Sequence, residues 1–315
     1  MKILVTGCAG FLGNFLTLKL LENGHSVTGI DNLNNYYDPE LKLERLGRIS
    51  SKNFKFVKLD INDIDNLNEN FDLLINFAAQ AGVRVSEAKQ KFYVKTNING
   101  FKKVLSFCEK NHIKKLLYAS SSSVYSDSII EPYSETTTDL SPKSTYGQTK
   151  LFNEFYVKNF NCSVDSVGLR FFSVYGPYGR PDMAYFSFTD SLKKGIPIKL
   201  HNKGEMMRDM TFIDDAINGI INSIDFLLKN KTKSEIFNIG NNSPIKTFEM
   251  LRIIEKKLGI TANIKNINVE NESKYTNADL DKSRRVIGYN PKVSFEEGIT
   301  KFLDWHNKYE SNEKG

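Results

Sequence analysis

The sequence is poor in the residues that cross-link small proteins or bind metals. Of its 315 residues only three are cysteine and four are histidine. Cys8, Cys108 and Cys162 are scattered and odd in number, which favours reduced thiols in the cytosol over a disulfide framework. The histidines share no ligand spacing. We therefore expect a cytoplasmic protein that holds no metal.

Long apolar runs and one-sided charge are also missing. No apolar run approaches the roughly 18 residues of a membrane span, and the first residues read as strand and loop instead of a cleaved signal. The 43 basic and 37 acidic side chains give a net charge of +6 without a basic stripe. We predict no membrane or nucleic-acid partner, although the charge mildly attracts a phosphorylated ligand.

A glycine motif stands at the N-terminus, directly after the apolar run 2–6. Gly7 permits a tight strand-to-helix turn, Gly10 lets a pyrophosphate approach the backbone, and Gly13 lets the helix lie close on the sheet. The helix that follows directs its positive end at the anion. The predicted cofactor-binding residues here are Gly7, Gly10, Phe11, Leu12 and Gly13.

A second apolar run, 27–30, ends at Asp31, eighteen residues after Gly13. A carboxylate at this place accepts hydrogen bonds from the adenosine ribose and repels a 2′-phosphate, so the sequence favours NAD over NADP. Asn32 is assigned to the same site. The alternative, a glycine-rich turn and a surface aspartate, explains the register of strand, glycines, helix and acid less well.

Short apolar segments recur at 54–59, 73–77 and 115–119, each followed by polar or helical sequence. This alternation predicts an α/β fold with a doubly wound parallel sheet of the Rossmann type. Ligands of such sheets bind beyond the carboxyl ends of the strands. The residues there that we assign to the cofactor are Asp60, Ile61, Ala78 and Ala79. Asp60 has two equal alternatives, a helix cap or a partner of the adenine amino group.

Asn97 lies in a helical stretch that is broken by Asn99-Gly100. The break predicts a bulge or kink, and Asn97 is also counted among the cofactor-binding residues.

Tyr146 and Lys150 are four residues apart, hence on one face of a helix. With a reference pKa of about 10 a tyrosine is a poor base, but a lysine cation and an oxidised nicotinamide both stabilise the phenolate. Hydroxyls of the run 120–123 can bridge a substrate oxygen to this tyrosine. The alternatives are a solvated pair and a polar loop.

These motifs together resemble the extended short-chain dehydrogenase/reductases that act on nucleotide sugars, of the NAD-dependent epimerase/dehydratase family. The resemblance covers essentially the whole chain. Within that family the chain is most similar to the UDP-glucuronate 4-epimerases. Four stretches carry this likeness, 31–38, 78–84, 170–184 and 207–215, and the third is the most specific.

The resemblance implies a redox-neutral inversion at C4, from UDP-glucuronate to UDP-galacturonate, through a transient 4-keto sugar and NAD. Tyr146 would take the proton from the C4 hydroxyl. Lys150 would hold the nicotinamide ribose and lower the tyrosine pKa, and Ser121 or its neighbours would bind the C4 oxygen. The resemblance also implies a homodimer that pairs helices around 92–108 and 146–160, and a role in polysaccharide biosynthesis.

Arg180 follows a strand at 166–172 on a loop rich in glycine and proline. Its guanidinium could form a bidentate pair with a hexuronate; the alternative is a structural loop arginine. Arg208 resembles the family's diphosphate clamp; the alternative is a surface ion pair with Asp209. Lys199 to His201 and the region of Glu272, where the family customarily has aspartate, resemble the nucleotide-binding edge. The predicted substrate-binding residues are Arg84, Ser121, Ser122, Ser123, Ser173, Arg180, Arg208 and Glu272.

Strands become sparse from about Val174, and helices are predicted at 214–229, 247–258, 281–287 and 295–308. By analogy with the family, residues 1–173 plus about 212–240 form the NAD-binding domain. Residues about 174–211 plus 241–315 form a smaller, interleaved α/β domain for the nucleotide sugar. The tail 310–315 is expected to be frayed.

Other activities on this fold place different groups before the Val124-Tyr125 pair. The 4,6-dehydratases have Asp-Glu there and the decarboxylases a glutamate, whereas this chain has Ser122 and Ser123. Asp31 disfavours an NADPH-dependent reductase. The remaining enzyme alternative is a 4-epimerase or 4-dehydrogenase of UDP-glucose, UDP-N-acetylglucosamine or a non-uridine sugar. A non-catalytic NAD-binding regulator is a further alternative, against which the Tyr146 and Lys150 pair speaks.

Overall fold

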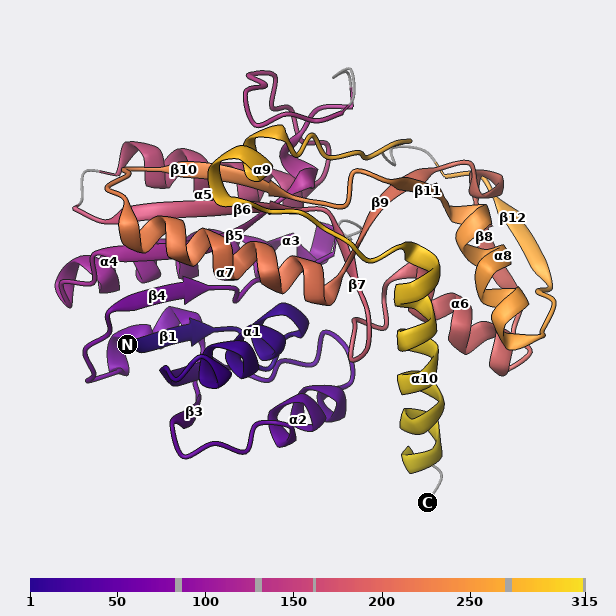
Figure 1. The fold of residues 1–315 in the computed structure, drawn as a ribbon, viewed down its shortest axis with the longest axis horizontal. Helices are drawn as coiled ribbons and strands as arrows, with labels where there is room; N and C mark the ends of the chain where they lie inside the picture. The colour runs from indigo at the N-terminus through magenta and orange to yellow at the C-terminus, as the bar shows by residue number, and fades with distance from the viewer. Residues whose placement is uncertain (83–86, 128–131, 161–162, 270–273, 314–315) are drawn as a thin grey trace.

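A computed structural model describes residues 1–82, 87–127, 132–160, 163–269 and 274–313. Its central feature is a seven-stranded sheet in the order β10-β6-β5-β4-β1-β2-β3, in which every neighbouring pair is parallel (Figure 1). The predicted doubly wound sheet is therefore confirmed. The strands are β1 (Lys2–Thr6), β2 (Ser26–Asp31), β3 (Phe54–Lys58), β4 (Leu73–Asn76), β5 (Lys115–Ser121), β6 (Asp165–Phe171) and β10 (Glu235–Ile239).

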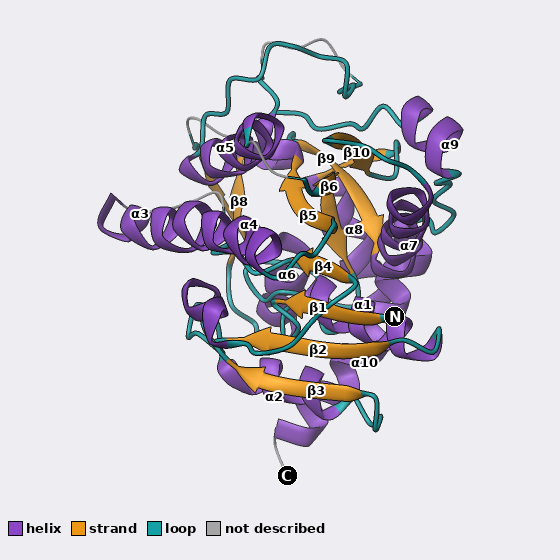
Figure 2. Cartoon of the chain, turned by 90° about the vertical axis from the view of Figure 1, so that its left-hand side faces the viewer, coloured by secondary structure: helices purple, strands orange, loops and turns teal. Residues whose placement is uncertain are grey.

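Helices cover both faces of this sheet, which is why its central strands are apolar on both sides. On one face lie α1 (Phe11–Glu22) and α7 (Ile213–Lys229), and on the other α4 (Phe101–Lys110) and α5 (Thr145–Asn159) (Figure 2). Beside α1 is α2 (Pro39–Gly47), which begins with a proline and is capped by the Asp38 side chain. The order of the strands reverses at β1, and ligand sites of such sheets lie at that point.

The helical stretch before β5 is broken, as the sequence predicts. Helix α3 (Glu87–Tyr93) passes into a π-helical segment, Val94–Gly100, which continues into α4. Asn97 lies in this segment and is buried. The break therefore orients one side chain inside the fold.

The second half of the chain adds two small sheets beside the large one. One contains β7 (Ser173–Tyr175), β9 (Met207–Phe212) and β11 (Pro244–Lys246), and the other β8 (Ile198–His201) and β12 (Ile264–Ile267). The prediction of sparse strands was wrong here because strands of three to six residues carry too little periodicity. The predicted return of the chain to the large sheet through α7 and β10 is found.

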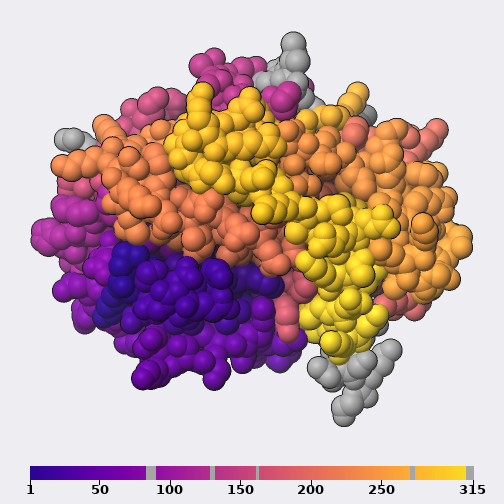
Figure 3. Space-filling model, viewed as in Figure 1, coloured from indigo at the N-terminus to yellow at the C-terminus, as the bar shows by residue number. Residues whose placement is uncertain are grey.

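Four further helices complete this half: α6 (Ala184–Lys193), α8 (Thr247–Leu258), α9 (Asp281–Ile287) and α10 (Phe295–Glu313). The bounds of α8 and α9 are those predicted. Helix α10 runs past its expected end at Lys308, so the tail that was expected to fray from residue 310 continues as helix to Glu313. In the space-filling view the C-terminal residues, in yellow, lie at the surface between the indigo N-terminal part and the orange residues of the smaller region (Figure 3).

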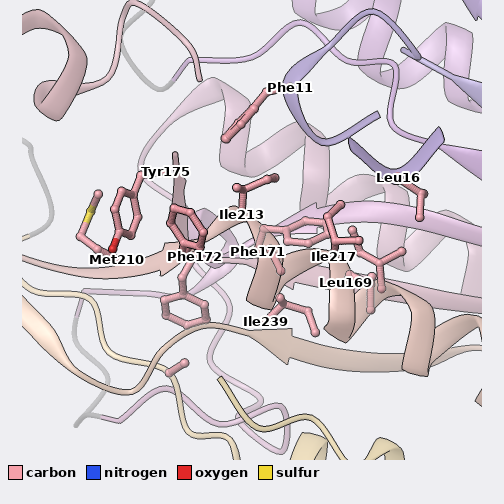
Figure 4. Packing of buried hydrophobic residues seen from close by; sticks show 14 of the residues in the cluster. Phe11, Leu16, Leu169, Phe171, Phe172, Tyr175, Met210, Ile213, Ile217 and Ile239 are labelled. Carbon is pink, nitrogen blue, oxygen red and sulfur yellow. The ribbon is translucent and has the colours of Figure 1, made fainter. Parts of the chain in front are cut away.

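One hydrophobic cluster joins the large sheet to the smaller region (Figure 4). Ile213 and Ile217 of α7 lie among Phe171 at the end of β6 and side chains of the smaller region such as Tyr175 and Met210. The shared core fixes the two regions against each other. None of the helices in the described part of the chain is long and apolar enough to cross a membrane.

Candidate active site

A cavity of about 1250 Å³ lies at the carboxyl edge of the large sheet and is lined by residues of both regions. Its volume exceeds the roughly 300–1,000 Å³ of an ordinary small-molecule pocket, which suits two ligands side by side. The predicted site residues that line it are Gly7, Gly10, Phe11, Leu12, Gly13, Asp31, Asn32, Ile61, Ala78, Ala79, Ser121, Ser122, Ser123, Tyr146, Lys150, Ser173, Arg180 and Arg208.

The glycine loop forms one wall, and its shape excludes side chains. Gly7 has a φ of +73°, and a Cβ there would lie 2.8 Å from the Ala78 nitrogen. A Cβ on Gly13 would lie 2.1 Å from the carbonyl oxygen of Gly7. The N-cap residue Gly10 has no side-chain hydrogen bond, so it leaves N–H groups of the first turn of α1 to an anion. This cradle fits the pyrophosphate of a dinucleotide.

Asp31 ends β2 at the next part of the cavity. Its two carboxylate oxygens accept the N–H groups of Ala9 at 3.2 Å and Leu33 at 2.9 Å, which fixes the acid beside the glycine loop. Lys42 of α2, which the sequence reasoning did not select, also lines the cavity and donates to the carbonyl oxygen of Asn34 at 2.7 Å. Burial lowers the pKa of Lys42, and Asp31 opposes this effect. An acid and a cation at this place fit an adenosine ribose.

Two residues assigned to the cofactor make hydrogen bonds within the fold. Asp60 caps the 3₁₀-helix that follows β3, because one oxygen accepts the Asn62 N–H at 2.9 Å and the other accepts the Asn32 amide at 2.9 Å. The capping alternative therefore holds for Asp60. Burial alone would raise the pKa of Asp60, but these hydrogen bonds outweigh it and lower the pKa.

Asn97 is not among the residues that line the cavity, so its binding to the cofactor stays a prediction. Its side chain is 2% exposed and exchanges two hydrogen bonds with the Gln80 backbone, at 2.8 and 3.0 Å. A third bond, at 3.0 Å, goes to the Thr149 hydroxyl on α5. Asn97 therefore ties the loop after β4 to the helix that carries Tyr146. The Asn-Gly break in the sequence signalled this structural role.

The predicted acid/base pair lies on α5, which begins at its N-cap Ser144. Lys150 is 2% exposed, and its Nζ atom lies 5.7 Å from the centroid of the Tyr146 ring. The same atom donates to the carbonyl oxygen of Ala119 at 2.8 Å. Burial lowers the pKa of Lys150 to about 8, although the nearby Glu154 carboxylate opposes this effect.

Tyr146 is partly buried in the cavity wall, and burial raises its pKa. The Arg180 guanidinium and a hydrogen bond with Ser121 oppose this shift. The sequence reasoning assigned that effect to Lys150, whose ammonium lies over the ring instead. Arg180 is thus the cation that favours the ionised form of Tyr146, but burial outweighs it and the pKa stays raised.

The four serines at the end of β5 and directly after it have different partners. Ser121 caps the short 3₁₀-helix Ser122–Val124 by accepting the Ser123 N–H at 3.1 Å, and it lies beside Tyr146. Ser120 donates instead to the buried Glu154 carboxylate. Ser120 is therefore bound to a structural carboxylate although it lines the cavity, and the other three serines line the same cavity.

Glu154 belongs to a buried ion pair that the sequence reasoning missed. Its oxygens accept the Arg170 Nε and Nη2 atoms at 2.9 and 2.7 Å, and the two side chains are only 8% and 4% exposed. Because Glu154 follows Lys150 by four residues on α5, it extends the stripe of Tyr146 and Lys150. The pair links α5 to β6 directly behind the predicted catalytic groups.

Arg180 has a partner on its own loop. Its Nε and Nη2 atoms donate to the two oxygens of Asp182 at 3.0 and 2.5 Å. The Tyr36 hydroxyl, from the loop after Asp31, donates to the same carboxylate at 3.2 Å. All three side chains line the cavity.

Arg208, on β9, lines the cavity together with Lys199, His201 and Thr276. The alternative of a surface ion pair between Arg208 and Asp209 was wrong. Asp209 is 0% exposed and accepts the backbone N–H groups of Asn241, Asn242 and Ala278 at 2.7 to 3.0 Å.

The predicted residues Arg84 and Glu272 lie outside the described part of the chain. Within that part, no group of three or more His, Cys, Asp or Glu side chains could hold a metal ion.

The chain is similar to several known proteins. CapI of Staphylococcus aureus is 38% identical over 98% of this chain and 99% of its own length. UDP-glucuronate 4-epimerase 1 of Arabidopsis thaliana is 37% identical over 98% of this chain and 77% of its own length.

Among solved structures, UDP-glucuronic acid 4-epimerase from Bacillus cereus in complex with UDP-glucuronic acid and NAD is similar, with a TM-score of 0.89 and 32% identity. The match covers 98% of this chain and 100% of that one. The model of the NAD dependent epimerase/dehydratase family matches residues 3–240. The chain belongs to that family.

Proposed function

We propose that the protein is an NAD-dependent isomerase that inverts C4 of UDP-glucuronate to give UDP-galacturonate, through a transient 4-keto sugar. One observation carries this conclusion. Tyr146, Ser121 and Arg180 line the same cavity as the glycine loop and Asp31. A phenol, a hydroxyl and a guanidinium thus lie within reach of one sugar bound beside a dinucleotide.

NAD, when bound, supplies the acceptor and donor of the hydride at C4. The glycine loop holds its pyrophosphate, Asp31 and Lys42 its adenosine ribose, and Lys150 its nicotinamide ribose. Tyr146 as phenolate accepts the proton of the C4 hydroxyl and later returns it. Ser121 holds the C4 oxygen beside the phenol.

On the substrate side, Arg180 binds the hexuronate carboxylate, with the hydroxyls of Ser122, Ser123 and Ser173 around it. Arg208 binds the diphosphate. Arg84 and Glu272 remain predicted substrate residues.

The reaction can be tested by incubating the purified protein separately with UDP-glucuronate, UDP-glucose and UDP-N-acetylglucosamine, and resolving the C4 epimers. We expect UDP-glucuronate to be converted fastest. Arg180→Leu should slow conversion of the hexuronate far more than that of a neutral hexose. Equal losses on both sugars would show that Arg180 does not bind a carboxylate, and would favour a 4-epimerase of a neutral sugar.

We also infer the predicted division of labour within the chain. Residues 1–173 plus about 212–240 bind NAD, and residues about 174–211 plus 241–315 bind the nucleotide sugar. The positions of the glycine loop in the first part and of Arg180 and Arg208 in the second support it. Arg208→Ala should raise KM for the nucleotide sugar and leave NAD affinity unchanged; a loss of NAD affinity would contradict the division.

The homodimer that the family resemblance implies is part of this proposal. Large apolar side chains are exposed on the helices concerned: Phe155 of α5 is 66% exposed, Phe92 of α3 50% and Val94 of the π-helical segment 43%. Covering them requires a partner surface. Sedimentation should give about twice the chain mass of 35.9 kDa, and Phe155→Lys should shift it toward the monomer. A monomeric wild type would contradict the proposal.

A cytoplasmic location and a role in polysaccharide biosynthesis complete the proposal. Cys8 and Cys108 are both buried. Titration of the unfolded chain without reductant should count three thiols, one for each cysteine; a count of one would indicate a disulfide and an oxidising compartment. Loss of galacturonate from surface glycans after deletion of the protein would test the biosynthetic role, and unchanged glycans would contradict it.

A further inference from the structure

We propose that Asp182 limits the preference of the cavity for a carboxylated sugar, because it holds the Arg180 guanidinium as an internal carboxylate with which a hexuronate competes. The inference rests on the proposed function of Arg180. It assigns to Asp182 a role in specificity, distinct from the chemistry at Tyr146.

The geometry of the pair is that of a substrate carboxylate on an arginine. Asp182 receives two parallel N–H bonds, from Nε and Nη2 of Arg180, which is the bidentate arrangement that a hexuronate would seek. A guanidinium has five N–H donors, so donors remain for a second anion. The side chains of Arg180 and Asp182 are 25% and 34% exposed, so a ligand in the cavity can reach them.

Asp182 is also held from the cofactor side. The Tyr36 hydroxyl donates to it at 3.2 Å from the loop that follows Asp31. Burial alone would raise the pKa of Asp182, but the hydrogen bond and charge of Arg180 outweigh burial and lower it. Asp182 is therefore ionised at neutral pH, and the charge of Arg180 is compensated before any sugar binds.

The consequences differ for the two kinds of sugar. A hexuronate brings a second negative charge to a guanidinium that already carries one, and the two anions repel each other. A neutral hexose meets a compensated ion pair and incurs no such repulsion. Asp182 thus weakens binding of the hexuronate selectively and reduces the difference in affinity between the hexuronate and a neutral hexose.

Asp182→Asn tests this inference on the full chain loaded with NAD. Titration calorimetry should show UDP-glucuronate binding roughly two- to fivefold tighter, the range expected of a partly exposed ion pair, and UDP-glucose unchanged. Tyr36→Phe is the matched control, since it removes one hydrogen bond to Asp182 but keeps the carboxylate. In this control the ratio of the affinity for UDP-glucuronate to that for UDP-glucose should stay near that of the wild type. A ratio that is unchanged or lower in Asp182→Asn overturns the inference.

Two further variants separate the possible failures. Asp182→Ser removes the same charge on this partly exposed loop, and it replaces Asp182→Asn if that protein does not fold. If Arg180→Leu leaves the ratio of affinities as in the wild type, Arg180 does not bind the carboxylate and the substrate proposal itself fails. If Arg180→Leu removes the preference but neither Asp182 variant increases it, only the competition proposed here is wrong.

Discussion

The cofactor side of the cavity is built from backbone, whereas the reaction side is built from side chains. Gly7 and Gly13 shape the first by having no Cβ, and their nearest neighbours are main-chain atoms. The second depends on the Tyr146 phenol, the Arg180 guanidinium and the buried groups behind them. An added atom should therefore damage the cofactor side, and a removed atom should damage the reaction side.

The largest effect is expected from the removal of one oxygen on the reaction side. Tyr146→Phe should lower kcat by about 10²- to 10⁴-fold, the usual worth of a positioned acid or base, because no other group replaces the phenol. NAD affinity and stability should stay near wild type. Product analysis by NMR measures kcat, and quenching of protein fluorescence by NAD measures the NAD affinity.

Tyr93→Phe is the control for this variant. Tyr93 packs against Tyr146 with ring centroids 6.5 Å apart, and its hydroxyl donates to the backbone carbonyl of Ala81 at 2.7 Å. It should retain most of the turnover. Wild-type rates in Tyr146→Phe would show that the tyrosine is not the acid or base. They would also contradict the expectation that the reaction side depends on its side chains.

The next largest effect concerns the ion pair that supports the reaction side. Glu154→Gln leaves the Arg170 guanidinium, 4% exposed, without its anion, and should lower the free energy of unfolding by about 3–5 kcal/mol. Urea denaturation measures it. Lys55→Gln is the control, because its pair with Glu69 leaves the lysine 62% exposed and should change stability by less than about 1 kcal/mol. Similar losses in both variants would show that burial does not distinguish the pairs.

On the cofactor side, Gly13→Ala adds one carbon where a Cβ would lie 2.1 Å from the Gly7 carbonyl oxygen. Helix α1 would have to shift away from the loop, so we expect a loss of about 1–3 kcal/mol in the free energy of unfolding and weaker NAD binding. Gly47→Ala is the control, since a Cβ at the end of α2 meets nothing within 4 Å. If the two alanine variants retain equal affinity for NAD, the glycine loop is not shaped by the contact described.

The cofactor side was largely predictable from the sequence because its determinants are local. The glycines, the apolar strands around them and Asp31 lie within 31 residues. Glycine stands at the positions where the tight turn and the close backbone approach require it. The spacing of Tyr146 and Lys150 places them on one helix face, but the pair was assigned to catalysis only in the context of the dinucleotide motif and the serine run. Arg180 was identified because the 170–184 stretch resembles the UDP-glucuronate 4-epimerases.

The partners of these residues were not predictable, because they come from distant parts of the chain. Tyr36 reaches Asp182 across 146 positions, and Arg170 meets Glu154 only through the packing of α5 on β6. Lys42 sits in an ordinary amphipathic helix. Asn97 differs from these residues, since it is predicted to bind the cofactor, whereas its side chain exchanges hydrogen bonds with the Gln80 backbone.

A last effect depends on pH and tests the free-energy cost of burying a cation on the reaction side. Burial lowers the pKa of Lys150 from its ordinary value of 10.5 to about 8. Between these values the unfolded chain keeps a proton that the native protein has released, so stability rises with pH in that window. One proton contributes at most about 1.4 kcal/mol per pH unit. Lys150→Met should lack this contribution, so urea unfolding from pH 7 to 10.5 should give wild type the steeper rise. Parallel curves would mean that the lysine stays protonated in the fold, and that the reaction side holds its charge at no measurable cost.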